Sequence, residues 1–206
     1  MFITFEGIEG AGKTTQIKLL YEFLKSRGNN VVITKEPGGT ELGKRIRDLI
    51  LNPNIDDKPI GMSEIFMYLA DRAHHVETFI KSYLKKNYFV ISDRYIDSTI
   101  AYQGYGRLFD IQILEYLNNI ATQGLKPDIT FILDLEVENG LNRIKNRNLL
   151  DRIEQESFEF HSRIRKGFLE ISKKENRFCV INSNDTIENV FEKIKNIIVD
   201  KIKIEM

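Results

Sequence analysis

The stretch FITFEGIEGAGKTT, residues 2–15, decides the fold of this chain. Residues 2–6 form a short run rich in Phe and Ile, which predicts a buried strand. Residues 7–14 match the pattern G-x-x-x-x-G-K-[ST] in full, and residues from 14 onward show helical periodicity up to Gly28. The strand, the glycine-rich loop and the helix follow one another in the order that a phosphate-binding loop requires, although a plain glycine-rich turn is the alternative.

The chemistry of this loop points to a nucleoside triphosphate. Its glycines let successive backbone N–H groups point inward around phosphate oxygens, and the helix that follows aims its positive end at the anion. Lys13 supplies a positive charge for the β- and γ-phosphates, and the Thr14 hydroxyl is placed to bind Mg²⁺. The residues predicted to contact the nucleotide are Gly7, Ile8, Glu9, Gly10, Ala11, Gly12, Lys13, Thr14 and Thr15.

The rest of the chain alternates short apolar runs with longer helical patterns. Continuous apolar runs predict strands that are covered on both faces, and strands that alternate with helices predict a parallel sheet. We therefore predict an α/β, P-loop NTPase fold: a five-stranded parallel sheet with helices on both faces, in a single domain over 1–206. The predicted strands are 2–6, 31–35, 88–92, 129–134 and 178–182, and the predicted helices are 14–27, 63–86, 110–123, 136–147, 152–174 and 186–204.

Composition excludes several classes of function. Thirty basic and thirty acidic side chains give a formal charge of zero, which argues against a nucleic-acid groove or a polybasic membrane anchor. The single cysteine, Cys179, lies in an apolar run and excludes an intrachain disulfide. No apolar stretch is long enough to span a membrane and no leader pattern is present, so we expect a cytoplasmic protein. The three histidines (His74, His75 and His161) lack metal-ligand spacing, and we assign them no role.

Charged residues follow the predicted strands at the edge where ligands bind. Asp93 comes at the end of the strand 88–92 and is a candidate second metal group, with a capping or loop aspartate as the alternative. Arg94 follows at once and suits planar recognition of a phosphate. The turn 36–40 follows another strand and leads into a helix that carries Arg47, although it is equally compatible with a simple turn.

Tyr68 and Arg72 are four residues apart on the predicted helix 63–86 and therefore share a face. An aromatic ring and a guanidinium together can stack on a base and donate hydrogen bonds to it. A core tyrosine beside a solvated arginine is the commoner arrangement, so this pair alone leaves both interpretations open.

Four motifs give the chain a close resemblance to the bacterial thymidylate kinase family. They are FEGIEGAGKTT at 5–15, EPGGT at 36–40, DRYIDSTIAYQ at 93–103 and LDRIE at 150–154. The third motif is the most specific, because it separates this family from other nucleoside monophosphate kinases. The resemblance covers nearly the whole chain and implies ATP as phosphoryl donor, dTMP as acceptor, Mg²⁺ as cofactor and a homodimer.

The resemblance also implies roles for single residues in the acceptor site. Tyr68 would stack on thymine, and Arg72 would donate to its O4. Arg47 and Arg94 would clamp the 5′-phosphate, and Tyr102 would block a ribose 2′-hydroxyl. Thr14 and Asp93 are the predicted metal residues, and Glu9 and Asp93 would organise the water around the metal. The full predicted dTMP site is Glu36, Pro37, Arg47, Tyr68, Arg72, Arg94, Ser98, Thr99, Tyr102 and Gln103.

The resemblance further implies a lid over about 141–153 that supplies the catalytic arginine. Positions 8–11 of the phosphate loop contain no arginine, whereas the lid contains three. Arg152 is our first choice for stabilising the charge of the transferred phosphoryl group and Arg147 the second, while Arg143 would flank adenine. A solvated basic loop is the alternative.

Three other functions remain as alternatives. A deoxynucleoside kinase would bind an acceptor without a phosphate, and the Arg47 and Arg94 pair speaks against it. A GTPase would need an N-K-x-D string, which the sequence lacks. A regulatory ATP-binding module without a small acceptor is separated from a kinase only by a substrate screen.

Overall fold

A five-stranded parallel sheet forms the centre of the structure, a computed structural model that describes residues 1–145 and 150–205. Its order, β2-β3-β1-β4-β5, places β1 in the middle and brings the carboxyl ends of the strands to one edge. This confirms the predicted fold class. The strands are β1 (Phe2–Glu6), β2 (Val31–Lys35), β3 (Phe89–Asp93), β4 (Ile129–Asp134) and β5 (Phe178–Asn182).

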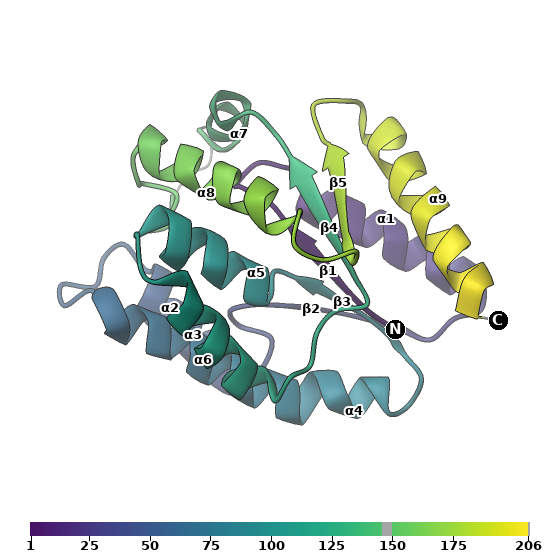
Figure 1. Ribbon diagram of the computed structural model, residues 1–206, viewed down its shortest axis with the longest axis horizontal. Coiled ribbons are helices and arrows are strands. Elements are labelled where there is room, and N and C mark those ends of the chain that lie inside the picture. Colours follow the sequence, from purple (N-terminus) through teal and green to yellow (C-terminus); the bar gives the residue numbers. More distant parts are fainter. Residues whose placement is uncertain (146–149, 206) are drawn as a thin grey trace.

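Helices cover both faces of this sheet (Figure 1). On one side α1 (Lys13–Ser26) packs against α9 (Ile187–Glu205). On the other side lie α3 (Gly61–His75), α6 (Ile111–Thr122) and α8 (Phe158–Ile171). The remaining helices are α2 (Glu41–Leu51), α4 (Lys81–Leu84), α5 (Ile96–Thr99) and α7 (Val137–Ile144), with π-helical segments at Val76–Ile80 and Ile100–Gly106.

The centre of the sheet is a rigid base for the loops at its carboxyl edge. All five residues of β1 are buried, because strands flank it on both sides and helices cover both faces. The hydroxyl oxygens of Thr4 and Thr130 lie 2.7 Å apart across β1 and β4, so these buried polar groups satisfy each other. The edge strands are partly exposed, and Cys179 on β5 is half-buried, which raises the pKa of its thiol.

Two of the predicted helices are interrupted or begin several residues later in the structure. The helix predicted over 63–86 is interrupted by the π-helical segment Val76–Ile80. The helix predicted to begin at 152 begins at Phe158, because the Asp151 carboxylate accepts hydrogen bonds from the backbone N–H groups of residues 153 and 154, both at 2.9 Å, and so forms a turn. Ser157 then caps α8 by accepting from the Phe160 N–H at 3.2 Å.

Sequence analysis predicts no helix over 96–106, where the structure has α5 and the π-helical segment Ile100–Gly106. That segment packs extensively against α8, so tertiary contacts rather than local periodicity stabilise it. The predicted strand 88–92 is shifted by one residue, and Asp93 is the last residue of β3.

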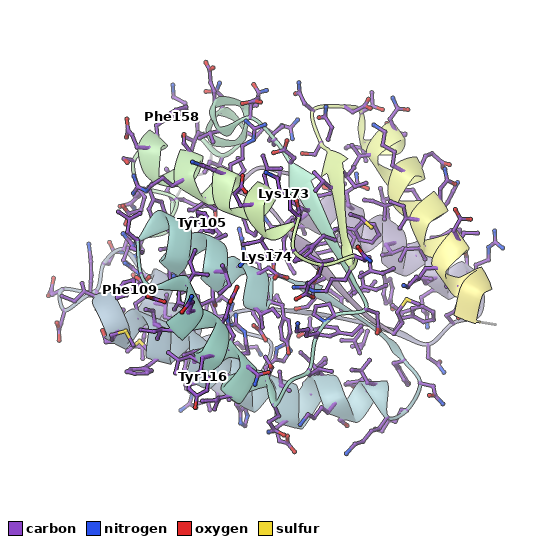
Figure 2. All side chains as sticks on the ribbon, in the orientation of Figure 1. Tyr105, Phe109, Tyr116, Phe158, Lys173 and Lys174 are labelled. Atoms are coloured by element: carbon purple, nitrogen blue, oxygen red, sulfur yellow. The ribbon has the colours of Figure 1, made fainter. Side chains whose placement is uncertain are left out.

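One apolar surface remains uncovered on α3 and α6. Phe66 on α3 is 54% exposed, and Ile113 and Ile120 on α6 are 53% and 55% exposed. Tyr116, also on α6, is 66% exposed and projects from the molecular surface (Figure 2). None of the helices in the described part of the chain is long and apolar enough to span a membrane.

Candidate active site

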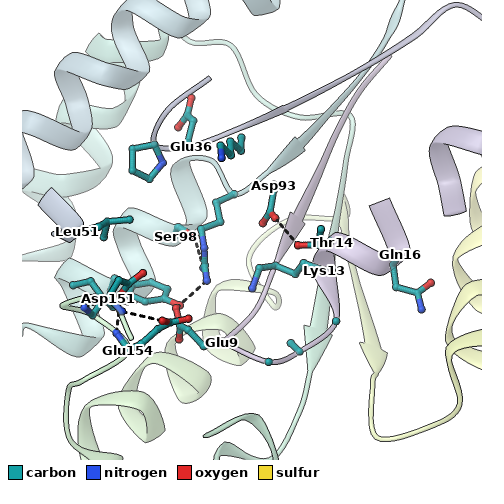
Figure 3. Close-up of a pocket in the computed structure, with 18 of the residues that line it drawn as sticks. Glu9, Lys13, Thr14, Gln16, Glu36, Leu51, Asp93, Ser98, Asp151 and Glu154 are labelled. Carbon is teal, nitrogen blue, oxygen red and sulfur yellow. Dashed lines mark hydrogen bonds and ion pairs between the residues drawn. The ribbon is translucent and has the colours of Figure 1, made fainter. Parts of the chain in front are cut away.

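A cavity of about 640 Å³ opens at the carboxyl edge of the sheet (Figure 3). The carboxyl ends of β1, β2 and β3, with the residues that follow them, contribute Lys13, Glu36 and Asp93 to its wall. The helix α3 contributes Tyr68 and Arg72 from the opposite side. The cavity therefore extends from the phosphate loop to a wall that carries an aromatic ring and a guanidinium.

The phosphate loop is held in shape by its own lysine. The Lys13 ammonium donates to the carbonyl oxygens of Gly7 and Ile8, both at 2.9 Å. Gly7 has a φ of 134° and a Cβ there would lie 2.6 Å from the Leu133 carbonyl oxygen, so only glycine fits between β1 and β4. Gly12 has a φ of 91° at the start of α1, where the helix N-terminus faces the cavity.

Burial also controls the charge of this lysine. Desolvation, together with the nearby Arg94, lowers the pKa of Lys13 to about 8. The carboxylates of Asp93 and Glu9 act in the opposite direction. Lys13 therefore stays largely protonated at neutral pH while its ammonium is poorly solvated, which favours its interaction with an incoming anion.

The helix α7 rests directly on the phosphate loop. A Cβ at Gly10 would lie 2.4 Å from the Gly140 carbonyl oxygen, and a Cβ at Gly140 would lie 2.6 Å from the Glu9 carbonyl oxygen. Arg143, one turn further along α7, donates from Nη1 to the Gly10 carbonyl at 3.1 Å. Two glycines thus allow a backbone approach that links the first part of the predicted lid to the nucleotide site.

Thr14 and Asp93 meet in the position expected for a metal. The Thr14 hydroxyl lies 3.5 Å from Asp93 Oδ2, and both residues line the cavity beside Lys13 (Figure 3). The described residues contain no group of three or more His, Cys, Asp or Glu side chains that could hold a metal ion by themselves. One hydroxyl and one carboxylate fit Mg²⁺, which keeps several waters and takes its other oxygens from a bound nucleotide.

Glu9 connects the phosphate loop to the rest of the site. Its Oε1 accepts from the Tyr102 hydroxyl at 2.5 Å and from Arg94 Nη2 at 3.0 Å, and its Oε2 lies 3.4 Å from His161 Nδ1. Burial by itself raises the pKa of this carboxyl, but His161 and the cationic Arg94 and Lys13 outweigh it and hold the pKa well below its ordinary range. Glu9 is therefore an anion at neutral pH.

Arg94 lies between the two ends of the cavity. Its guanidinium donates to the Gly7 carbonyl at 3.2 Å and to the Ser98 hydroxyl at 3.1 Å, and it stacks 4.9 Å from the Tyr102 ring centroid. The backbone of Arg94 has a φ of 72°, which is uncommon for a residue with a side chain. These contacts fix a positive charge next to the phosphate loop.

Arg72 and Tyr68 form the far wall. Arg72 is 2% exposed and donates from Nε to Glu36 at 2.7 Å and from Nη1 to Thr99 and Asn118 at 2.7 and 2.6 Å. Arg72 is thus held by defined partners, so it is not the solvated arginine of the alternative interpretation, and its contact with a base stays a prediction. Tyr68 is half-buried, and burial raises the pKa of its phenol, so that the hydroxyl stays protonated.

Arg152 does not reach the cavity. Its Nε donates to the Ile50 carbonyl at 2.8 Å, and its Nη2 forms an ion pair with the buried Glu64. The other oxygen of Glu64 accepts from Gln103 Nε2 at 3.0 Å, and Arg107 Nε lies 3.7 Å from it. Arg147, our second choice for the catalytic arginine, lies outside the described residues.

Most other predicted site residues come together around the cavity. Arg47 lies next to the 36–40 turn and donates to the Pro37 carbonyl at 2.9 Å. Gly7 and Ile8 contribute backbone carbonyls to Lys13 but do not line the cavity. The predicted residues that line it are Glu9, Gly10, Ala11, Gly12, Lys13, Thr14, Thr15, Glu36, Pro37, Arg47, Tyr68, Arg72, Asp93, Arg94, Ser98, Thr99, Tyr102, Gln103 and Arg143.

Sequence analysis misses Glu6, which holds the site together from beneath. Its Oε1 accepts from the Tyr95 N–H at 2.8 Å, and its Oε2 accepts from the Ser98 hydroxyl at 2.6 Å. Burial, reinforced by the nearby Asp97, raises the pKa of Glu6 to about 8. A carboxylate as the last residue of a fully buried strand is the signal that could have identified it.

A second missed group lines the cavity where Gln16 of α1 donates to the Ile187 carbonyl, beside the connection from β5 to α9. The carboxyl end of β5 lies at the same edge of the sheet as those of β1 and β3, which is the signal that could have found this group. Its members are Gln16, Ser183, Asp185, Ile187 and Val190.

Comparisons with known proteins identify the family of this chain. A family model described as "Thymidylate kinase" matches residues 5–194. A curated thymidylate kinase of Trichodesmium erythraeum is 47% identical over 98% of this chain and 96% of its own length, and one of Carboxydothermus hydrogenoformans is 50% identical over 94% of both. The crystal structure of thymidylate kinase from Ehrlichia chaffeensis superimposes with a TM-score of 0.78 at 38% identity, covering 96% of this chain and 97% of that one. The chain belongs to the thymidylate kinase family.

Proposed function

We propose that this chain transfers the γ-phosphoryl group of ATP to dTMP, giving ADP and dTDP. The observation that carries the proposal is that one continuous cavity joins the phosphate loop to the wall formed by Tyr68 and Arg72. A donor bound at one end and an acceptor bound at the other would meet beside Arg94, which already contacts the loop through Gly7. This arrangement favours direct transfer between two bound nucleotides over a GTPase or a regulatory ATP-binding module.

The chain's own residues supply positioning and positive charge rather than a covalent intermediate. The phosphate oxygen of dTMP is already an anion, so alignment and charge neutralisation suffice for its attack on the γ-phosphorus. Lys13 would exchange its two carbonyl partners for phosphate oxygens of ATP, while Arg94 and Arg47 would hold the phosphate of dTMP. Glu9, which is ionised and bonded to Arg94, orients that guanidinium between the two substrates.

We propose Thr14 and Asp93 as the residues that hold Mg²⁺. The ion would neutralise charge on the β- and γ-phosphate oxygens of the bound nucleotide. Their separation of 3.5 Å supports the proposal.

The base and the sugar of dTMP would occupy the far wall. Tyr68 would stack on thymine, Arg72 would donate to O4, and Thr99 and Gln103 would surround the ring. Tyr102 would exclude a ribose 2′-hydroxyl, and its hydrogen bond to Glu9 would fix the ring in that position. Adenine would lie at the opposite end, between Arg143 and the residues of the β5–α9 connection.

The catalytic arginine of the lid remains a proposal that requires movement. Arg152 would stabilise the charge of the transferred group only after its guanidinium leaves Glu64 and the Ile50 carbonyl. Arg147 is the second candidate. Short connections such as 150–156 are common sites of closure over a bound nucleotide, which supports a conformational step before transfer.

We also propose that the protein is a cytoplasmic homodimer that binds neither nucleic acid nor membrane. The uncovered apolar surface of α3 and α6, which includes Phe66 and Tyr116, supports a second copy as partner. The balanced charge supports a protein that binds neither nucleic acid nor membrane. The use of ATP and Mg²⁺, which are available in the cytoplasm, supports that location.

A substrate screen tests the proposed reaction. ADP release is measured with ATP and Mg²⁺ against dTMP, dUMP, dCMP, dAMP and dGMP in turn, with formation of the diphosphate checked by chromatography. We expect the highest kcat/KM with dTMP, and no turnover in excess EDTA. Higher kcat/KM with another acceptor, or ADP release that does not depend on an acceptor, would overturn the proposal.

Lys13→Met is the matched control for the screen, because it removes the ammonium while keeping an unbranched side chain of similar length. More than about a tenth of the parent turnover in this variant, a difference of less than ~1.4 kcal/mol, would overturn the assignment of the ATP site.

A further inference from the structure

A buried histidine lies next to the wall formed by Tyr68 and Arg72 and takes no part in the reaction proposed above. His75 is the last residue of α3 and is 0% exposed. Its Nδ1 lies 2.9 Å from Glu36 Oε1, and its Nε2 lies 2.6 Å from the Thr34 hydroxyl. A Cβ at Gly39 would come within 2.4 Å of His75 Nε2, so the turn after β2 closes directly over the ring.

These partners determine how the imidazole ring is oriented. An ionised carboxylate only accepts hydrogen bonds, so the hydrogen between His75 and Glu36 belongs to Nδ1. Thr34 can either donate to Nε2 or accept from it, and it holds the opposite side of the ring in both cases. The ring is therefore fixed between the strand β2 and the first residue after it.

The second oxygen of Glu36 extends this chain of contacts to Arg72. Glu36 Oε2 accepts from Arg72 Nε at 2.7 Å, and both residues line the cavity. Three further N–H groups of Arg72 donate to Thr99, Asn118 and the Tyr95 carbonyl. A guanidinium has five N–H donors, so one donor on Nη2 has no partner among the described residues and is available to a ligand.

We propose that His75 is a positioning residue for recognition of the acceptor base. By donating to Glu36, it fixes the carboxylate that orients Arg72, and so directs the free N–H of Arg72 at the 4-keto oxygen of a pyrimidine. The inference rests on the proposed function. It adds a residue that touches neither substrate and predicts an effect on the choice of base rather than on phosphoryl transfer.

The ratio of kcat/KM for dTMP to kcat/KM for dCMP measures this role. Cytosine carries an amino group where thymine has the keto oxygen, and an arginine donor in a fixed orientation matches only the keto group. The ratio does not depend on the fraction of enzyme that is folded and active, because that fraction multiplies both values equally. A merely structural role for His75 would therefore leave the ratio unchanged.

Two substitutions at the same position separate the two ring nitrogens. The amide nitrogen of His75→Asn lies near the place of Nδ1 and keeps a donor to Glu36, whereas that of His75→Gln lies near Nε2 and leaves Glu36 without this donor. We expect the ratio to fall by about tenfold or more in His75→Gln, the scale of a displaced hydrogen bond to a charged group, and to stay within about threefold of the parent in His75→Asn. The KM for ATP should be unchanged in both.

Thr34→Val provides a second variant that removes only the hydroxyl facing Nε2, and it decides the outcome if His75→Gln does not fold. We expect a smaller fall in the ratio, of about threefold, because the ring loses one of its two anchors. A parental ratio in His75→Gln, or in Thr34→Val where His75→Gln does not fold, would overturn the role of His75 while leaving the kinase reaction intact. Failure of the parent protein to phosphorylate dTMP would instead overturn the proposed function.

Discussion

The substitution Gly140→Ala adds a single methyl group, which should lower activity while changing stability little. Gly140 lies inside α7, and a Cβ there would come 2.6 Å from the Glu9 carbonyl oxygen and 3.0 Å from Ile8 Cδ1. An ordinary carbon–oxygen contact needs ~3.3 Å, so Gly140→Ala must move α7 and the phosphate loop apart by ~0.7 Å. The substitution itself favours the helix by ~1 kcal/mol, because alanine has the higher helix propensity.

Displacement of the phosphate loop should lower the activity. A misplacement of ~1 Å in a reacting geometry can lower a rate by ~10²-fold, so we expect kcat/KM for ATP to fall by about 10- to 100-fold. The midpoint of thermal unfolding should change little, because the gain in helix propensity offsets part of the strain. Coupled ADP release at varied ATP and saturating dTMP measures the first quantity, and a thermal melt measures the second.

Glu138→Ala is the matched control, because Glu138 is an exposed residue of the same helix. It should leave both quantities at the parental value. If Gly140→Ala keeps kcat/KM for ATP within about threefold of the parent, a difference below ~0.7 kcal/mol, the contact between α7 and the loop does not control the nucleotide site.

Three further predictions follow from charges in and around the cavity. The pKa of about 8 for Lys13 predicts that kcat/KM for ATP falls above pH 8, as the ammonium that binds phosphate is lost; a flat profile up to about pH 9.5 would contradict this. Burial, and after it repulsion from the Glu36 carboxylate, raises the pKa of Asp71 from 3.8 to about 6. The ionised form of Asp71 therefore destabilises the fold fully above pH 6 and not at all below about pH 3.8. Asp71→Asn should therefore raise the free energy of unfolding by about 1–3 kcal/mol at pH 8 and hardly change it at pH 4, which urea unfolding at the two pH values checks; an equal change at both would refute it. Arg152→Ala should lower kcat by ~10²-fold with a much smaller change in the KM for dTMP, and should do so again in a Glu64→Gln background; a loss confined to the parent background would make this arginine an anchor only.

Local patterns in the sequence predict the sheet and the phosphate loop well. Continuous apolar runs mark all five strands, and the loop 7–14 is set by residues that are adjacent in the chain. The turn at Asp151 delays α8 because a side chain there competes with the helix for backbone N–H groups. Periodicity alone does not contain that competition, which explains the wrong start of this helix.

Contacts between distant residues could not be predicted in the same way. His75 meets Glu36 across 39 positions, and Arg152 meets Glu64 across 88. The spacing of the histidines excludes a metal site but says nothing about a carboxylate brought close by folding. The family resemblance and the absence of arginine at positions 8–11 mark Arg152 as a catalytic candidate, whereas its partner depends on how α3 lies beside the 150–156 connection.

The shared carboxylate of Glu64 has a consequence for how this enzyme can diversify. One of its oxygens accepts a hydrogen bond from Gln103, which lines the cavity, and the other pairs with Arg152 in the predicted lid. A lineage that replaced Gln103 to accept a different base would change the hydrogen bonding of an anion that also restrains Arg152. With the acceptor site proposed above, substrate range and the anchoring of Arg152 are therefore not independent traits, and substitutions at positions 103 and 152 should be inherited together.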